Sequence, residues 1–253
     1  MAWRNERTSC EAWRRALTLA SVLVTSGPSL GAHPLVTEDT GTQGRGKFEL
    51  ENAFQRQHDG VDRSWEYAPQ LSYGVGDSVD IAARLQWLEQ RSTDSQQRGL
   101  GDSAIDVKWR FHDAGALTLG VRAGIDLPTA SADKGFGAGK ASVHGVLVAS
   151  LDAADTAWHG NIGYARNPRI GERRALWHAS VALLWGATPT LRLAAEAAAD
   201  SDPDPARGTW QKSLGLGAIL AARDGFDIDV GCRRGKGSIS RGTTLLAGAT
   251  LRW

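Results

Sequence analysis

The feature that most constrains this chain is an alternation of apolar and polar residues with period two. In residues 79–87, Val, Ile, Ala, Leu and Trp occupy every second position, and residues 105–111 and 117–125 repeat the pattern. Successive side chains of a β-strand point to opposite faces, so this period predicts strands, and no sustained helical period competes with it. The pattern predicts twelve strands, near residues 46–57, 65–75, 79–90, 103–112, 116–127, 141–151, 156–166, 175–186, 190–199, 209–221, 225–233 and 242–253.

Composition agrees with a β protein. The 253 residues include 30 Gly and 10 Trp, and glycine weakens helices whereas aromatic residues favour strands. No apolar run of about 18 residues is present, so no transmembrane helix is expected. Lys+Arg 29 against Asp+Glu 28 leaves no basic surplus, which excludes nucleic acid as a partner.

Residues 1–32 have the composition of a secretory signal peptide. Four arginines precede a short apolar stretch at 16–24, and small residues follow up to Ala32. We expect cleavage after Ala32, and an amphipathic N-terminal helix is the alternative. Cys10 lies before the apolar stretch, so a lipoprotein anchor is not expected. The leader predicts an exported protein.

Short and long connections alternate between the predicted strands. Turns at 76–78, 112–115 and 152–155 are short, whereas the connections at 91–102 and 128–140 are long. A soluble β-sandwich also shows period two, but outer-membrane barrels combine it with short periplasmic turns, long outer loops and an even strand count. The alternation therefore favours a membrane barrel with both ends in the periplasm.

Tryptophan positions support the same interpretation. All eight Trp residues after the leader fall on the apolar face of their strands. The predicted topology places one set near the outer strand ends and the other near the inner ends, as expected for the two aromatic girdles of a membrane barrel. The outer set is Trp65, Trp87, Trp177 and Trp210, and the inner set is Trp109, Trp158, Trp185 and Trp253.

The last strand alternates up to an aromatic terminal residue, Trp253. Such an end resembles the signal read by the outer-membrane barrel assembly machinery, which we expect as a partner. The fold class is therefore all-β: a single closed transmembrane antiparallel β-barrel of about twelve strands, preceded by a signal peptide. We expect residues 46–253 to form the barrel in the lipid of the bacterial outer membrane, and residues 33–45 to form a periplasmic N-terminal segment.

Several segments resemble one bacterial outer-membrane family. They are residues 33–44 (HPLVTEDTGTQG), 71–75 (LSYGV), 99–102 (GLGD) leading into Lys108, 127–129 (LPT) and 135–140 (GFGAGK). The sequence is similar here to the meta-pathway phenol-degradation or "transporter" barrels, which are related to the exporters of functional amyloid. The resemblance implies a twelve-stranded barrel that moves solutes across the outer membrane. The amyloid exporters carry a long helical periplasmic extension that this chain lacks before its first strand.

The polar face of the strands carries charges of both signs. These side chains should pair across neighbouring strands or meet water, and Glu49 and Glu51 can reach Arg252 where the first strand meets the last. They form either a polar pathway of mixed charge or a salt-bridge network that fills a narrow barrel. The lumen and constriction candidates are Glu49, Glu51, Glu66, Asp80, Arg84, Asp106, Lys108, Arg110, Arg122, Asp126, Arg192, Glu196, Asp227, Asp229, Arg233 and Arg252.

Two segments are candidates for a plug or gate. The N-terminal segment is polar, is rich in Gly and Thr and precedes the first strand, so it either inserts into the lumen or stays as a periplasmic tail. The loop 128–140 could fold inward or cover the outer mouth. The plug and gate candidates are His33, Glu38, Asp39, Thr40, Gln43, Phe136 and Lys140.

Cofactor sites are not expected. Residues 135–140 resemble a phosphate-binding loop, but no helix follows, and Ala141 stands directly after Lys140 where the motif needs Ser or Thr. The inward histidines His144, His159 and His178 lie at different depths, so a metal site is not predicted. His33 as a new N-terminus could chelate copper, but no second histidine is near it in sequence.

An enzyme is not expected either. A lipid hydrolase needs Ser and His within hydrogen-bond reach, and the rim candidate is His58 with Asp59, Asp62 and Ser64 near it in sequence. A structural or adhesive barrel is the other alternative, although the loops are short for a binding surface. The sequence favours a passive, cofactor-free channel or transporter for small solutes, aromatic or otherwise hydrophobic compounds among them. It leaves the solute, the direction of transport and the oligomeric state open.

Overall fold

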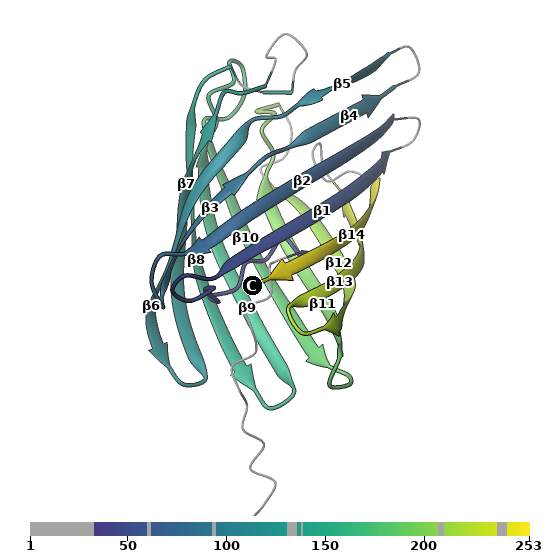
Figure 1. Cartoon of the computed structure of the whole chain (residues 1–253). Helices are drawn as coiled ribbons and strands as arrows, with labels where there is room; N and C mark the ends of the chain where they lie inside the picture. The colour runs from purple at the N-terminus through teal and green to yellow at the C-terminus, as the bar shows by residue number, and fades with distance from the viewer. Residues whose placement is uncertain are drawn as a thin grey trace, which may run out of the picture.

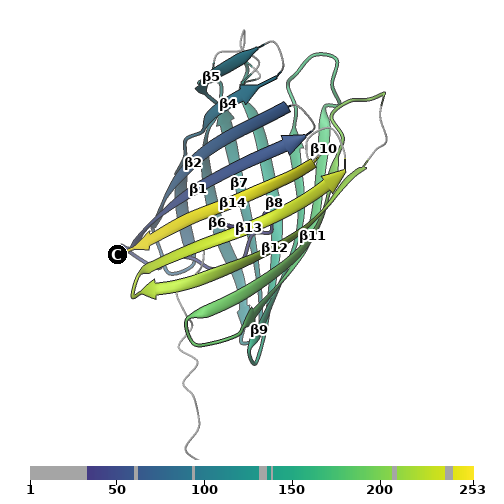
Figure 2. The same cartoon turned by 90° about the vertical axis from the view of Figure 1, so that its right-hand side faces the viewer.

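The computed structural model describes residues 33–59, 62–92, 95–130, 136–137, 139–206, 210–236 and 242–253. They form one antiparallel sheet that closes into a barrel because β1 pairs with both β2 and β14 (Figures 1 and 2). No helix in this part of the chain is long and apolar enough to cross a bilayer. The strands are β1 (Phe48–Asp59), β2 (Asp62–Gly74), β3 (Val79–Arg84), β4 (Trp87–Arg91), β5 (Gln96–Leu100), β6 (Ser103–Ala114), β7 (Leu117–Leu127), β8 (Ser142–Ala153), β9 (Thr156–Arg166), β10 (Ala175–Gly186), β11 (Leu191–Ser201), β12 (Trp210–Arg223), β13 (Phe226–Lys236) and β14 (Gly242–Arg252).

The barrel has twelve strands but fourteen strand segments, because two of its strands are interrupted. β3 and β4 pair with β2 in one continuous register and are separated only by Leu85 and Gln86. Leu85 faces Pro69 of β2, which has no N–H to donate, so the regular ladder breaks there. Likewise, β5 leads into β6 across Gly101 and Asp102. The twelve-strand barrel is confirmed.

One predicted connection is wrong. The stretch 91–102 was expected to be a loop, but β5 lies within it and pairs with β4. The resulting β4–β5 hairpin projects beyond the neighbouring strands in Figure 1. Polar residues such as Gln96, Gln97 and Arg98 obscured this strand, because the hairpin is exposed and lacks the apolar face by which the other strands were found.

The two faces of the sheet are inverted relative to a soluble protein. All eight tryptophans are exposed, by between 45% and 58%, together with many Leu, Ile and Val side chains. Carboxylates lie on the opposite face and are buried, as at Glu49, Asp106 and Asp229. An apolar exterior with a polar interior is the arrangement that a bilayer requires of a barrel.

The two rims of the barrel differ. The C-terminus and the short turns share one rim, where Phe48 and Trp253 exchange backbone hydrogen bonds and their rings stack. Glycines with positive φ, Gly115 and Gly225, allow two of these tight turns. We call this end the inner rim. The β4–β5 hairpin and the long connections mark the opposite end, which we call the outer rim (Figure 1).

Candidate functional site

The N-terminal segment, residues 33–45, lies inside the barrel and follows its inner wall. Its contacts begin at β13, pass β11, β9, β8 and β7, and reach β3 before the chain enters β1. The polar side chains that form these contacts are the ones that strand alternation turns toward the lumen. The candidate site is therefore the lumen together with the segment that occupies its inner half.

The first residues of the segment rest on a wall of small side chains. The ring of His33 bonds to Asp229, and Pro34 lies so close to Gly217 that a Cβ there would be 2.7 Å from its Cγ. Leu35 packs on an apolar cluster that includes Ile219. Glycine in β12 thus makes room for the segment, which explains why the strand lacks a side chain there.

Two lumen side chains hold the backbone of the segment. Glu196 Oε2 accepts hydrogen bonds from the backbone N–H of Val36, at 2.8 Å, and from the N–H and hydroxyl of Thr37, both at 2.7 Å. Asn161 receives the N–H of Glu38 at 2.6 Å and donates to its carbonyl at 2.9 Å. These contacts satisfy buried backbone groups that have no strand partner.

The Glu38 carboxylate forms the central ion pairs of the site. Its oxygens lie 2.8 Å from Lys108 Nζ and 2.7 Å from an Arg122 nitrogen, and Lys108 also lies 3.1 Å from Asp39. Burial alone would raise the pKa of Glu38, but the charges and hydrogen bonds of Lys108 and Arg122 outweigh it and hold the pKa at about 2. Glu38 is therefore ionised at neutral pH and binds the segment to β6 and β7.

Arg122 extends this network along the wall. It donates to Asp106 at 2.9 Å and to Gln70 at 2.5 Å, and Gln70 in turn donates to Glu51 at 2.7 Å. His144 bridges the carboxylates of Asp106, at 2.6 Å, and Asp126, at 3.1 Å. A connected network of this kind compensates charges that would otherwise be costly to bury.

A second network closes the seam between the first and last strands. Arg252 donates to Glu49 at 2.7 Å and to Asp227 at 2.9 Å, so the predicted contact of Arg252 with Glu49 is present. Glu51 was expected to share Arg252 but instead accepts from Gln70. Gln43 links the segment to this seam by donating to Glu49 at 2.7 Å.

The remaining anchors of the segment are hydroxyl and carboxylate groups. The backbone N–H of Thr40 donates to Ser150 at 3.1 Å, and its hydroxyl contacts that of Thr118. The N–H of Gln43 donates to Asp80 at 3.0 Å. Residues from widely separated strands thus hold a stretch of chain without regular secondary structure.

Other predicted lumen residues lie apart from the segment. Glu66 accepts from Gln86 at 2.6 Å nearer the outer rim, and Arg233 donates to Gln55 at 3.4 Å. Arg192 lies 3.8 Å from Asp227, and Arg84 is half-buried on the inward face of β3. Arg110 lies at the inner rim, where it donates to the carbonyl of Asp77 at 3.3 Å.

The loop 128–140 is described in part. Phe136 is buried and its ring lies against Gly99 of β5, where an added Cβ would be 3.4 Å from the ring. Lys140 is exposed. Phe136 therefore covers the β4–β5 hairpin at the outer rim and does not enter the site around Glu38.

The charged half of the lumen is nearly full. The space left among Glu38, Glu49, Glu51, Asp80, Lys108 and Arg122 is a cavity of about 20 Å³, which is about the room that one water needs. Through this part of the described structure, no solute larger than water could pass along the cavity without movement of the segment.

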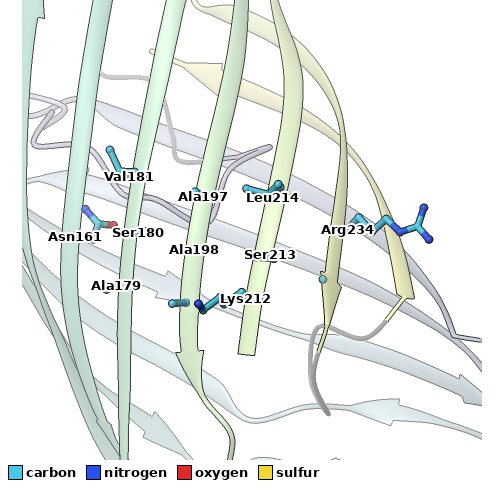
Figure 3. Close-up of a pocket in the computed structure, with 12 residues that line it drawn as sticks. Asn161, Ala179, Ser180, Val181, Ala197, Ala198, Lys212, Ser213, Leu214 and Arg234 are labelled. Atoms are coloured by element: carbon cyan, nitrogen blue, oxygen red, sulfur yellow. The ribbon is translucent and has the colours of Figure 1, made fainter. Parts of the chain in front are cut away.

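A much larger cavity lies along the opposite wall. It has a volume of about 780 Å³ and is lined by β9 to β13 (Figure 3). Its lumen-facing row consists of small or short polar side chains, Asn161, Ser180, Ala198 and Ser213, since alternation turns the exposed Leu214 to the lipid side. We call this cavity the vestibule. Asn161 borders it and also bonds to Glu38, so the vestibule adjoins the segment.

The described residues form no metal site, and the predicted rim dyad of His58 and Ser64 is not formed. No group of His, Cys, Asp and Glu is arranged to hold a metal ion in the described ranges. The three inward histidines bond to separate partners: His159 lies 2.8 Å from Ser150, and His178 lies 2.7 Å from Asp200 and 2.9 Å from Ser180. His58 and Ser64 occupy opposite faces of the β1–β2 ladder and cannot form a dyad.

Uncharged partners of the segment were missed by the sequence analysis. Asn161 and Gln70 are inward polar residues of β9 and β2, but the lumen candidates were chosen among charged strand positions only. Glycines that alternate with apolar residues, such as Gly217, could have indicated a close approach of another backbone.

Comparisons with known proteins agree with this architecture. Residues 34–253 match the family described as "Putative MetA-pathway of phenol degradation". An outer membrane channel from Pseudomonas putida F1 superposes with TM-score 0.68 at 11% identity, covering 85% of this chain and 98% of that one. The KdgM porin superposes with TM-score 0.59 at 7% identity, covering 80% of this chain and 98% of the porin. No curated protein matches the chain in sequence.

The match covers most of the chain, residues 34–253 of 253, and the chain belongs to this family. At these identities the solved structures show a shared fold, which is that of outer-membrane porins and channels. The chain is accordingly an outer-membrane-type β-barrel of the phenol-degradation family.

Proposed function

We propose that the protein is a passive outer-membrane channel for small solutes, and that its N-terminal segment is a plug that must move before solute passes. The observation that carries the proposal is the position of Glu38, which lies inside the lumen between Lys108 and Arg122. A similar fold in an outer membrane channel and in a porin supports a channel over an enzyme.

The vestibule supports a small solute. Its volume of about 780 Å³ is within the range of pockets that hold small organic molecules, roughly 300 to 1,000 Å³. Its wall of Ala, Ser and Gly offers apolar surface with a few hydrogen-bonding groups. Small aromatic compounds fit a cavity with such a lining, and the solute would stay bound in the vestibule until the plug moves.

Orientation and assembly follow from the rims. Barrels of this type place short turns in the periplasm and long loops outside, so the inner rim faces the periplasm and the vestibule opens outward. The C-terminal strand with Trp253 serves as the signal for the barrel assembly machinery, and bilayer lipid surrounds the exposed aromatic residues.

The test is single-channel conductance of the exported chain, which begins at residue 33, with and without residues 33–45. We expect the intact chain to be closed or to open rarely, and the deleted chain to conduct steadily. Heat-modifiable gel mobility controls for folding of both proteins. Uptake of a small aromatic solute into vesicles should increase in parallel with conductance.

Two results would contradict the proposal. Equal steady conductance of both chains would show that the segment does not close the lumen. If neither folded chain conducts, the structural alternative is favoured, in which the charge network keeps the lumen permanently filled.

A further inference from the structure

A row of basic side chains crosses the lipid-facing side of the sheet near the outer rim. The strand registers place Arg234 opposite Thr243, Thr243 opposite His58, His58 opposite Arg63 and Arg63 opposite Arg91. Neighbouring strands lie about 4.8 Å apart, so the row forms one continuous arc. The side chains of His58, Arg63, Arg91 and Arg234 are all exposed.

Two further cations flank the row. Lys212 lies on the lipid-facing side of β12, two residues before Leu214, which is opposite Arg234. Arg56 lies opposite Trp65, and its guanidinium is 4.8 Å from the centre of the Trp65 ring. We call these six residues the outer-rim arc: Arg56, His58, Arg63, Arg91, Lys212 and Arg234.

The depth of the arc is that of lipid headgroups. Trp65 and Trp210 lie next to it and are each 49% exposed, and exposed tryptophans of a barrel mark the interface between hydrocarbon and headgroups. Toward the inner rim the same strands carry Leu216, Val230 and Leu245, which are exposed apolar residues of the hydrocarbon band. The cations therefore face the headgroup layer and not the lumen.

Charge on this surface is almost entirely positive. Among the described residues, Glu89 is the one carboxylate on the lipid-facing positions of β12, β13, β14, β1, β2 and β4. Glu89 accepts from Gln96 at 2.7 Å and lies 3.9 Å from Arg91. One carboxylate cannot balance the arc, so an anionic partner from outside the chain would stabilise it.

Among the described residues, the outer ends of β6, β7 and β8 lack such a surface. At the outer ends of β6, β7 and β8, a corresponding row consists of Ile105, Ile125 and Val143, which are 47% to 49% exposed. Cations are thus not a general property of this rim but are concentrated on one side.

We propose that the outer-rim arc binds the phosphate groups of the phosphorylated glycolipid of the outer leaflet, lipid A. Arginine recognises phosphate through bidentate hydrogen bonds, and several arginines at one depth match a lipid that carries more than one phosphate. The acyl chains of the same lipid would lie on the apolar residues below the arc. This site is separate from the lumen and does not depend on plug movement.

The experiment compares three forms of the protein, each purified from membranes and placed in vesicles of phosphatidylethanolamine. The forms are the unaltered protein, an outer triple variant (Arg63→Gln, Arg91→Gln, Arg234→Gln) and an inner triple variant (Arg45→Gln, Lys47→Gln, Arg223→Gln). The inner variant removes the same charge from exposed positions at the other rim. Each form is measured with lipid A, with lipid A stripped of its phosphates and with neither.

We expect lipid A to raise the unfolding temperature of the unaltered protein and of the inner triple variant. The outer triple variant should show no such rise, and lipid A stripped of its phosphates should raise the unfolding temperature of none of the three forms. The rise should shrink at high salt because the sites are exposed. An equal rise in all three forms, or an equal rise with stripped lipid, would overturn the proposal. If the outer triple variant does not fold, Arg63→Gln alone should reduce the number of lipid A molecules retained in native mass spectrometry, and unchanged retention would overturn the proposal.

Conductance recorded from a further variant separates this inference from the channel proposal. The double variant Arg63→Gln, Arg91→Gln should conduct as the unaltered protein does, because both residues lie on the lipid-facing side of the sheet and neither borders the vestibule.

Discussion

The two walls of the lumen differ in a way that indicates how the barrel is closed. Along the wall formed by β1 to β7, Glu38 of the N-terminal segment and the wall's buried ions Lys108 and Arg122 leave a cavity of about 20 Å³. On the wall formed by β9 to β13, small side chains such as Ala198 and Ser213 leave about 780 Å³. Both walls belong to the same twelve-strand barrel, so the number of strands alone does not decide whether its lumen is open. We propose that the inward residues and the N-terminal segment decide it.

The largest effect is expected from removal of the charge at the centre of the filled wall. Glu38→Ala would leave Arg122 and Lys108 without one of their carboxylate partners. Loss of one member of a buried ion pair typically costs about 3 kcal/mol or more, which corresponds to roughly a hundredfold shift toward the released plug. Single-channel recording should show far more frequent openings.

A matched control for this variant is Asp152→Asn, which removes an exposed carboxylate at an inner-rim turn. It should leave the openings unchanged. If Glu38→Ala also leaves them unchanged while the deletion of residues 33–45 opens the channel, the ion pairs do not hold the plug.

Acid should weaken the same contact. The pKa of Glu38 is about 2 in the docked segment and 4.5 when unperturbed, so its stabilisation is complete above about pH 4.5 and is lost as the pH falls toward 2. The full effect is of the order of 3 kcal/mol. Openings of the unaltered channel should increase below pH 4.5, and the difference between its pH profile and that of Glu38→Gln should be flat above pH 5. A difference that varies between pH 6 and 8 would contradict this account.

A smaller effect is expected where the segment rests on small residues. Gly217→Ala would place a Cβ 2.7 Å from Pro34, and overpacking of this kind costs about 1 to 3 kcal/mol. Hydrogen exchange of residues 35–37 should become faster. Gly160→Ala is the control, because a Cβ there meets nothing within 4 Å. Equal exchange in both variants would show that Pro34 is not held against β12.

The smallest change concerns the vestibule. In the chain without residues 33–45, Ala198→Phe should reduce conductance severalfold because residue 198 faces the lumen. Ala195→Phe, on the lipid-facing side of the same strand and outside the vestibule lining, should have no effect. Similar conductance of the two variants would place the conducting path away from the β9–β13 wall.

The sequence predicted the fold well and the site in part. Period two, the tryptophan positions and the alternating connection lengths determine a barrel, because each reflects a local constraint of the bilayer. The register of β1 against β14 also brought Arg252 to Glu49 as expected. The β4–β5 hairpin was missed because it extends beyond the membrane-facing part of the sheet, where no apolar face is required.

The position of the N-terminal segment could not be predicted from the same rules. The contacts of Thr37 with Glu196 and of Glu38 with Arg122 join residues far apart in sequence, and no periodicity records them. Without the path of the segment, residues 33–45 could equally have been a periplasmic tail. The charge pattern of the strands therefore predicts a polar lumen but not what fills it.

The most direct test of the central claim locks the segment to the wall. The hydroxyls of Thr40 and Thr118 are in contact, so cysteines at these two positions can form a disulfide. The pair is placed in a chain that also carries Glu38→Ala, to favour opening, and Cys232→Ser, to remove the exposed native thiol. Single-channel conductance is then recorded before and after reduction. We predict no openings in the oxidised form and frequent openings after reduction, whereas equal conductance in both forms would contradict closure of the lumen by the N-terminal segment.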